Sequence, residues 1–128
     1  MSGKSVAEKL FVKEGYRVLI INEPDGYRTA LGKLPQKVDI STKKSGQADL
    51  IQLFVDSRKE LEANLRPLKA CLRPKGLLWV SYPKGTSKVK TDINRDTIGS
   101  YAQSIGLQPV AMISIDETWS ALRLKYVS

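Results

Sequence analysis

Side chains that could bind or transform a ligand follow several predicted strands of this 128-residue chain. Because the carboxyl ends of parallel strands share one edge of a sheet, we expect these side chains to meet there. Lysines could neutralise an anion, aromatic rings could stack on a ligand, and carboxylates could act as bases. The sequence therefore predicts a cleft for a small polar or anionic ligand, formed by Asn22, Glu23, Asp25, Tyr27, Asp56, Tyr82, Lys84, Lys88, Asp116, Glu117 and Trp119.

The same side chains also have a purely structural interpretation. Asp25-Gly26 is a common turn sequence, and Asp116 could accept hydrogen bonds from the amides of a hairpin turn. Trp119 could cover the end of the core, and the lysines of residues 83–91 could simply face solvent. Both interpretations stay open on the sequence alone.

The residue types that are missing narrow the chemistry. The chain has no histidine, and Cys71 is its one cysteine. Ser-His and Cys-His nucleophile pairs, the common zinc sites and an internal disulfide are therefore excluded, and we predict no metal site. Catalysis would have to come from Asp, Glu, Lys, Tyr or a bound cofactor. Glu23 and Asp116 are the candidate bases, but the sequence assigns no catalytic residue.

Six segments have the apolar patterns of strands. Residues 16–22 (YRVLIIN) are almost continuously apolar, which is typical of a strand buried on both faces of a parallel sheet. The link at residues 116–120 is short enough only for an antiparallel pair. The further predicted strands cover residues 37–42, 48–55, 77–82, 109–115 and 121–127.

Helices are predicted between these strands from capping residues and apolar periodicity. Pro67 lies inside one of the helical patterns and is expected to kink or split that helix. Residues 73–76 (RPKG) predict a turn after it. The predicted helices cover residues 5–11, 27–31, 57–72 and 94–105, with capping boxes at Ser5 and Ser57 and an N-cap at Asn94.

The alternation of strands and helices, finished by a hairpin, predicts one α/β domain over residues 1–128. We expect a doubly wound, mostly parallel, Rossmann-type sheet of six strands in the order 2-1-3-4-6-5, with strand 6 antiparallel. In such sheets ligands bind where the strand order reverses, here between strands 1 and 3. The short second strand lies at an edge and could pair across a homodimer.

Two features resemble the class I S-adenosylmethionine-dependent methyltransferases. Residues 48–55 (ADLIQLFV), the helix after them and the segment 72–80 (LRPKGLLWV) look like that fold's fourth strand, the following helix and the turn into its fifth strand. The terminal hairpin is shared as well. More closely, residues 18–27, 79–84 with 91–92, and 116–123 resemble a small bacterial family of methyltransferase-like proteins without an established function, so this second resemblance implies a fold and no activity.

One segment departs from the methyltransferase pattern. After the first strand that fold has a turn of the form D-x-G-x-G-x-G, whose glycines let the backbone approach the cofactor, whereas residues 22–27 read NEPDGY. Pro24 removes a backbone donor, and the side chains fill space that the cofactor would need. The acidic group that grips the ribose is also not evident, since Asp39 lies inside its strand. The sequence therefore predicts no cofactor, with S-adenosylmethionine binding disfavoured.

Charge and hydropathy suggest where the protein acts and what it meets. The net charge of +8 favours anionic partners, although no basic run is longer than Lys43-Lys44. No stretch approaches the roughly 18 apolar residues of a membrane span, and the N-terminus lacks the apolar run of a signal peptide, so we expect a cytoplasmic protein.

Three functional hypotheses follow from the sequence. The first is a non-catalytic binding or regulatory module for a small polar or anionic ligand or a protein partner. The second is an atypical S-adenosylmethionine-dependent methyltransferase, or an enzyme that uses the carboxylates and lysines of the predicted cleft. The third is weak, non-specific binding of nucleic acid, which the net charge favours but no motif supports.

Overall fold

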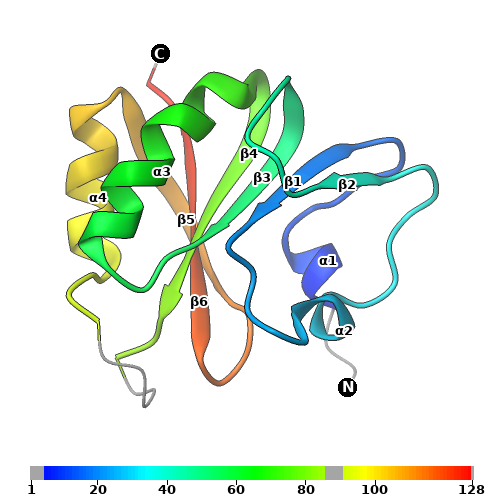
Figure 1. Ribbon diagram of the computed structural model, residues 1–128, viewed down its shortest axis with the longest axis horizontal. Helices are drawn as coiled ribbons and strands as arrows, with labels where there is room; N and C mark the ends of the chain where they lie inside the picture. Colours follow the sequence, from blue (N-terminus) through cyan, green and yellow to red (C-terminus); the bar gives the residue numbers. More distant parts are fainter. Residues whose placement is uncertain (1–4, 86–90, 128) are drawn as a thin grey trace.

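The computed structural model describes residues 5–85 and 91–127. Figure 1 shows a twisted central sheet, with two longer helices at one side and two short helices near the N-terminus. The elements are α1 (Val6–Lys9), β1 (Arg17–Ile21), α2 (Tyr27–Leu31), β2 (Asp39–Ser41), β3 (Ala48–Phe54), α3 (Arg58–Cys71), β4 (Leu72–Pro83), α4 (Arg95–Ser104), β5 (Leu107–Ser114) and β6 (Trp119–Tyr126).

The sheet has the predicted topology. Its strand order is β2-β1-β3-β4-β6-β5. Strands β2, β1, β3 and β4 pair in parallel, and β6 runs antiparallel to both β4 and β5. The strand order reverses between β1 and β3, so the carboxyl ends of these two strands form the ligand-binding edge expected of an open α/β sheet.

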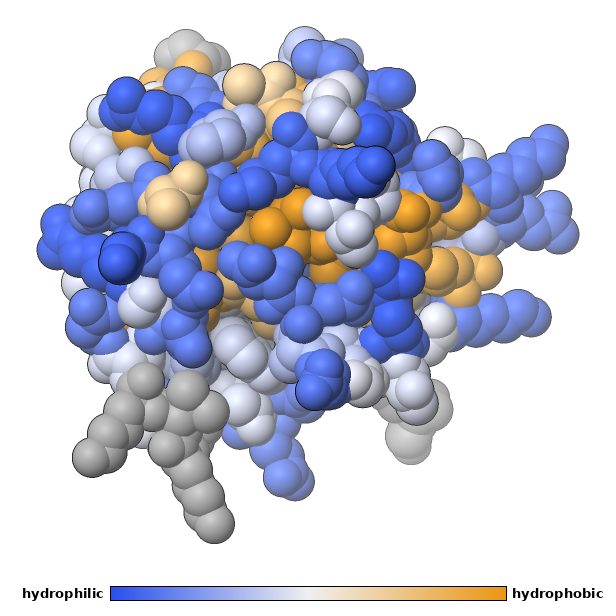
Figure 2. All heavy atoms as spheres, in the orientation of Figure 1, coloured by the Kyte–Doolittle hydropathy of each residue, from blue (hydrophilic) through white to orange (hydrophobic). Residues whose placement is uncertain are grey.

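Successive residues of β1 face two apolar layers. Leu19 and Ile21 pack with the apolar faces of α3 and α4. Val18 and Ile20 pack on the opposite face, with side chains from α1 and α2. This burial of both faces explains why the strand is apolar throughout. On the face seen in Figure 2, an apolar strip beside α3 is surrounded by hydrophilic side chains.

The predicted caps fix the helix starts. Ser5 and Asn94 each form a capping box with the residue three positions later. Ser57 also caps its helix, because its side chain accepts a hydrogen bond from the Glu60 amide. The Glu60 carboxylate, however, accepts from the backbone N–H of Asp56 (3.1 Å) rather than from Ser57. The α3 cap is therefore tied to the end of β3.

Two local expectations need correction. Pro67 does not split its helix, and α3 continues through it as one element, because its apolar face is held against the sheet by Leu61, Leu65 and Leu68. Residues 73–76 do not form a simple turn. They belong to β4, where five steps along β4 match two along β3 between the pairs Ala48–Leu72 and Leu50–Leu77, so this segment bulges out of the sheet.

The hairpin between β5 and β6 confirms the predicted antiparallel link. The Asp116 carboxylate accepts hydrogen bonds from the amides of Thr118 and Trp119, both at 2.8 Å. The backbone amide of Ile115 also donates to the Trp119 carbonyl oxygen. No helix within residues 5–85 and 91–127 is long and apolar enough to cross a membrane.

Candidate functional site

The turn after β1 is built from two left-handed backbone positions. Asn22 has a φ of 61° and Gly26 a φ of 80°. Asparagine tolerates this conformation better than most residues, and glycine adopts it without strain. Asn22 and Asp25 are exposed, whereas the Glu23 carboxylate accepts hydrogen bonds from Nε and Nη2 of Arg28 at 2.8 and 2.9 Å. The turn thus presents an amide and a carboxylate to solvent.

Tyr27 does not line this edge but points into the core. Its ring packs edge-on against Phe54, with centroids 4.7 Å apart. Its hydroxyl donates to the Gln52 side-chain oxygen at 2.6 Å, and the Gln52 amide nitrogen donates to the Ser81 hydroxyl at 3.1 Å. Burial raises the pKa of the Tyr27 hydroxyl well above its ordinary value. Tyr27 therefore anchors a buried polar chain that crosses β3 and β4.

The other two predicted aromatic residues are also partly structural. Trp119 is half-buried and packs edge-on against Phe54, with centroids 5.1 Å apart. Tyr82 is buried, and its hydroxyl donates to the Met112 sulfur at 3.1 Å. Burial also raises the pKa of Tyr82. Of the two side chains, that of Trp119 is the more exposed.

Two carboxylates meet at the end of β3. Asp56 is exposed and lies beside Glu60, and the contact between their side chains raises the pKa of Glu60 above its ordinary value. The hydrogen bond from Glu60 to the Asp56 side chain, together with the negative charge of Asp56, favours the protonated form of Glu60. The Asp56 carbonyl oxygen also accepts from the Thr91 hydroxyl (2.6 Å), which connects the site to the segment before α4.

The predicted lysines contribute less than expected. The Lys84 ammonium donates to the Ser114 hydroxyl at 2.5 Å, and its backbone amide donates to the Thr118 carbonyl oxygen. Lys84 thereby connects β4 to the hairpin. Lys88, the second predicted anion ligand, lies outside the described residues.

Together these segments form the carboxyl rim, defined here as residues 22–28, 55–58, 83–85, 91–92 and 115–118. Its described residues carry six acidic side chains and three basic ones. This excess holds for the described part of the rim, which attracts cationic groups; Lys88 and Lys90 belong to residues 86–90, outside the described residues. The acidic members are Glu23, Asp25, Asp56, Asp92, Asp116 and Glu117.

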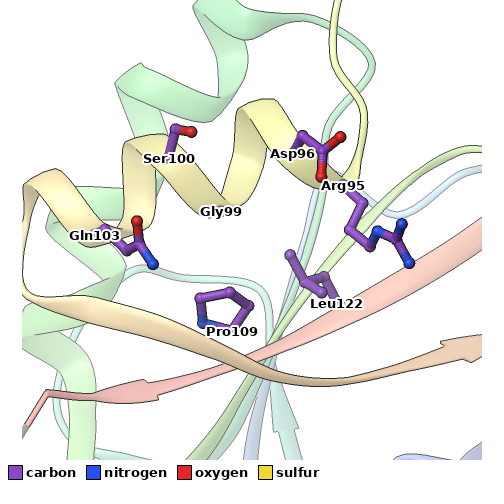
Figure 3. Close-up of a pocket in the computed structure, with 7 residues that line it drawn as sticks. All are labelled: Arg95, Asp96, Gly99, Ser100, Gln103, Pro109 and Leu122. Carbon is purple, nitrogen blue, oxygen red and sulfur yellow. The ribbon is translucent and has the colours of Figure 1, made fainter.

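A groove of about 410 Å³ lies beside the rim, between α4 and the β5–β6 pair. In Figure 3 the side chains of Arg95 and Gln103 extend from α4 toward Leu122 and Pro109. Gly99 leaves room at the middle of the helix. Residues four positions apart on a helix lie on the same face, so Arg95, Gly99 and Gln103 form one wall of the groove. Their spacing in the sequence indicates this shared face.

The buried polar chain was also missed. Gln52 and Ser81 are fully buried in the middle of otherwise apolar strands. An amide and a hydroxyl in such strands need partners, because an unpaired buried polar group destabilises the fold. Gln52 within residues 48–55 and Ser81 within residues 77–82 were therefore the sequence features that indicate a buried hydrogen-bonded chain.

Neither a protein-family model nor a curated protein matches this sequence. Solved structures do match the fold. A ribosomal protein L11 methylase from Lactobacillus delbrueckii subsp. bulgaricus is 12% identical and superposes with a TM-score of 0.62 over 96% of this chain and 76% of its own. A SAM-dependent methyltransferase from Aquifex aeolicus is 13% identical, with a TM-score of 0.63 over 95% of this chain and 88% of its own.

A third match is DhpI in complex with S-adenosylhomocysteine. It is 11% identical, with a TM-score of 0.64 over 95% of this chain and 83% of its own. This chain has the class I methyltransferase fold. The fold predicted from the sequence is therefore confirmed over nearly the whole chain.

The prediction that this methyltransferase-like chain takes no cofactor is contradicted. Structures that share its fold are SAM-dependent methyltransferases, and DhpI is found with S-adenosylhomocysteine and with S-adenosylmethionine. From the sequence we expected the side chains of residues 22–27 to fill the cofactor's space. Instead, Tyr27 turns into the core, and Asn22 and Gly26 supply the left-handed positions of the turn.

Proposed function

We propose that this methyltransferase-like chain binds S-adenosylmethionine at the carboxyl rim and is an atypical methyltransferase. The observation that carries the proposal is the fold, shared with SAM-dependent methyltransferases over 95% or more of this chain in three solved structures. These structures favour the methyltransferase over the non-catalytic binding module. The carboxyl ends of β1 and β3 are where an open α/β sheet places its ligand.

The charge of the rim suits this cofactor. S-adenosylmethionine carries a sulfonium and an ammonium group, and six acidic side chains lie on the described residues of the rim. Asn22 and Asp25, exposed on the turn after β1, would hold its polar groups, and Glu117 adds negative charge from the hairpin. When bound, S-adenosylmethionine supplies an electrophilic methyl group.

Proton transfer is assigned to the end of β3. The two bases considered from the sequence are committed elsewhere, because Glu23 pairs with Arg28 and Asp116 accepts the hairpin amides. Asp56 is exposed beside Glu60, whose pKa it raises. Asp56 would therefore accept the proton that an oxygen or nitrogen nucleophile of the substrate loses, and Glu60 would share it.

A charge-reversal pair tests the location of the cofactor. Asp25→Lys changes the charge of the carboxyl rim by two, and Glu14→Lys makes the same change on an exposed residue before β1, at the opposite end of that strand. The binding of S-adenosylhomocysteine is followed by tryptophan fluorescence at low salt. We expect Asp25→Lys to weaken binding at least tenfold and Glu14→Lys to change it less than twofold. Equal losses in both variants would contradict the proposed site.

A further inference from the structure

Among the described residues, charge is segregated between the two ends of the sheet. The amino rim, defined here as residues 12–17, 37–39, 42–49, 66–76 and 124–127, lies along the amino ends of β1, β3 and β4 (upper part of Figure 1). It carries ten basic and three acidic side chains. One of the three acids, Asp49, is already engaged by the Arg17 amide (2.8 Å) and the Arg73 guanidinium (3.1 Å). The amino rim therefore attracts anions, in contrast to the acidic carboxyl rim.

The bulge in β4 projects from the middle of the amino rim. Three extra residues at positions 73–76 carry exposed Arg73 and Lys75 away from the sheet. Gly76 closes the bulge against the strand, because a Cβ there would lie 3.0 Å from the backbone oxygens of Arg73 and Asp49. The bulge is thus packed in place, and its basic side chains are held on one ridge.

A groove lies on each side of this ridge. One, of about 440 Å³, is lined by Tyr16, Asp49 and residues 73–76. The other, of about 290 Å³, is lined by residues 74–77 and 123–126, which include Tyr126. The grooves share residues 74–76, so they flank the same ridge of the amino rim. Each contains one half-exposed tyrosine beside basic side chains.

The tyrosine of the second groove is fixed in position. The Tyr126 hydroxyl lies 2.6 Å from the carbonyl oxygens of both Lys69 and Leu72, and it donates its one proton to either of them. The Lys69 ammonium lies 5.9 Å from the centre of the Tyr126 ring. A ring anchored at its hydroxyl offers its remaining surface without losing further side-chain freedom on binding.

We infer that the amino rim binds single-stranded nucleic acid. Proteins that bind single strands combine a basic groove for the phosphates with aromatic rings on which bases stack. Arg73, Lys75 and Lys125 supply the positive charge, and Tyr16 and Tyr126 supply the rings. This inference does not rest on the proposed methyltransferase activity, because the amino rim and the carboxyl rim lie at opposite ends of the same strands.

Salt dependence tests the inference first. The probe is a fluorescein-labelled 20-nucleotide oligouridylate, and the readout is anisotropy with the intact chain. Each phosphate neutralised on a single strand contributes a slope of about −0.7 to log K against log salt. Three basic residues of the amino rim line the grooves, namely Arg73, Lys75 and Lys125. We therefore expect affinity to fall about 20-fold between 50 and 200 mM salt. No binding at 50 mM salt would overturn the inference.

Matched variants place the binding on the amino rim. We expect Lys75→Glu to weaken oligouridylate binding at least tenfold, and Lys59→Glu, the same change on an exposed residue of α3, to weaken it less than twofold. Tyr16→Leu keeps an apolar side chain but removes the stacking surface, and should weaken binding at least fivefold. Circular dichroism melting of each variant checks that it folds.

Other results would overturn the inference. Equal losses in Lys75→Glu and Lys59→Glu would indicate a general charge effect. No change in Tyr16→Leu, with equal or tighter binding to phosphatidylserine vesicles, would indicate an anionic membrane surface instead. Saturating S-adenosylhomocysteine should leave the affinity for oligouridylate within twofold, and displacement of the oligonucleotide would place it on the carboxyl rim.

Discussion

The buried chain from Tyr27 through Gln52 to Ser81 gives the sharpest stability prediction. Gln52 is fully buried, accepts from the Tyr27 hydroxyl at 2.6 Å and donates to the Ser81 hydroxyl at 3.1 Å. Tyr27→Phe removes one donor and leaves the Gln52 oxygen unsatisfied in the core. Leaving one buried polar atom without its partner costs about 1–3 kcal/mol, so we expect a loss of about 2 kcal/mol in the free energy of unfolding.

The same substitution should behave differently when Gln52 is already Leu. In that background the Tyr27 hydroxyl has lost its acceptor, so removing it relieves an unpaired buried group. We expect Tyr27→Phe to be neutral or stabilising there, which gives a coupling energy of about 2 kcal/mol between the two side chains.

Equilibrium unfolding in guanidinium measures this coupling. Trp79 is fully buried and reports the loss of the core by its fluorescence. For a chain of this size a loss of 2 kcal/mol corresponds to a fall in Tm of about 8 °C. The reasoning is refuted if Tyr27→Phe costs less than about 0.5 kcal/mol, or if it costs the same in both backgrounds.

Three further predictions concern stability. Because folding raises the pKa of the Tyr27 hydroxyl, the stability that Tyr27 contributes is complete below its unfolded pKa of about 10 and is lost as the pH rises above that value. In denaturation experiments from pH 8 to 11, the free energy of unfolding should therefore fall less steeply with pH in Tyr27→Phe than in the unchanged protein. Gly76→Ala should destabilise by about 1–3 kcal/mol in thermal melts, because the added Cβ crowds backbone oxygens at 3.0 Å, whereas Gly85→Ala meets nothing within 4 Å and should be neutral. Asp56→Asn should return the pKa of Glu60 toward its ordinary value and raise Tm by about 1 °C at pH 7, with a smaller gain at pH 3, where Glu60 is protonated.

Most of the sheet could be predicted because its signals are local. The apolar run at residues 16–22 and the short link at 116–120 determine a buried parallel strand and an antiparallel hairpin. Ser5 and Asn94 cap helices through contacts three residues away. Each of these features depends on residues that are close together in the sequence. The helices and strands could therefore be located, and the strand order was inferred from their alternation.

The errors arose where tertiary packing overrides a local rule. Pro67 removes one helical hydrogen bond, but the leucines of α3 bury enough surface to keep the helix continuous. The RPKG segment at residues 73–76 contains turn residues, yet pairing of Leu72 with Ala48 keeps it in the strand as a bulge. Neither outcome can be read from the segments themselves.

The candidate site was the least predictable part. The sequence predicts Tyr27 and Trp119 at the carboxyl edge of the sheet, but the direction of a side chain depends on partners far along the chain. Tyr27 is directed by Gln52, 25 residues away, and the Trp119 ring by Phe54. The prediction against a cofactor was wrong for a similar reason. It rested on the glycines that the turn lacks, and the left-handed backbone of Asn22 cannot be recognised from the sequence.

Calorimetric titration of the purified chain with S-adenosylmethionine and S-adenosylhomocysteine, at low and moderate salt, tests the central claim most directly. The proposal predicts saturable binding in the micromolar range at one site per chain, strongly weakened by Asp25→Lys and little changed by Glu14→Lys. The absence of heat with either compound at millimolar concentration, from a protein shown to be folded, would contradict it.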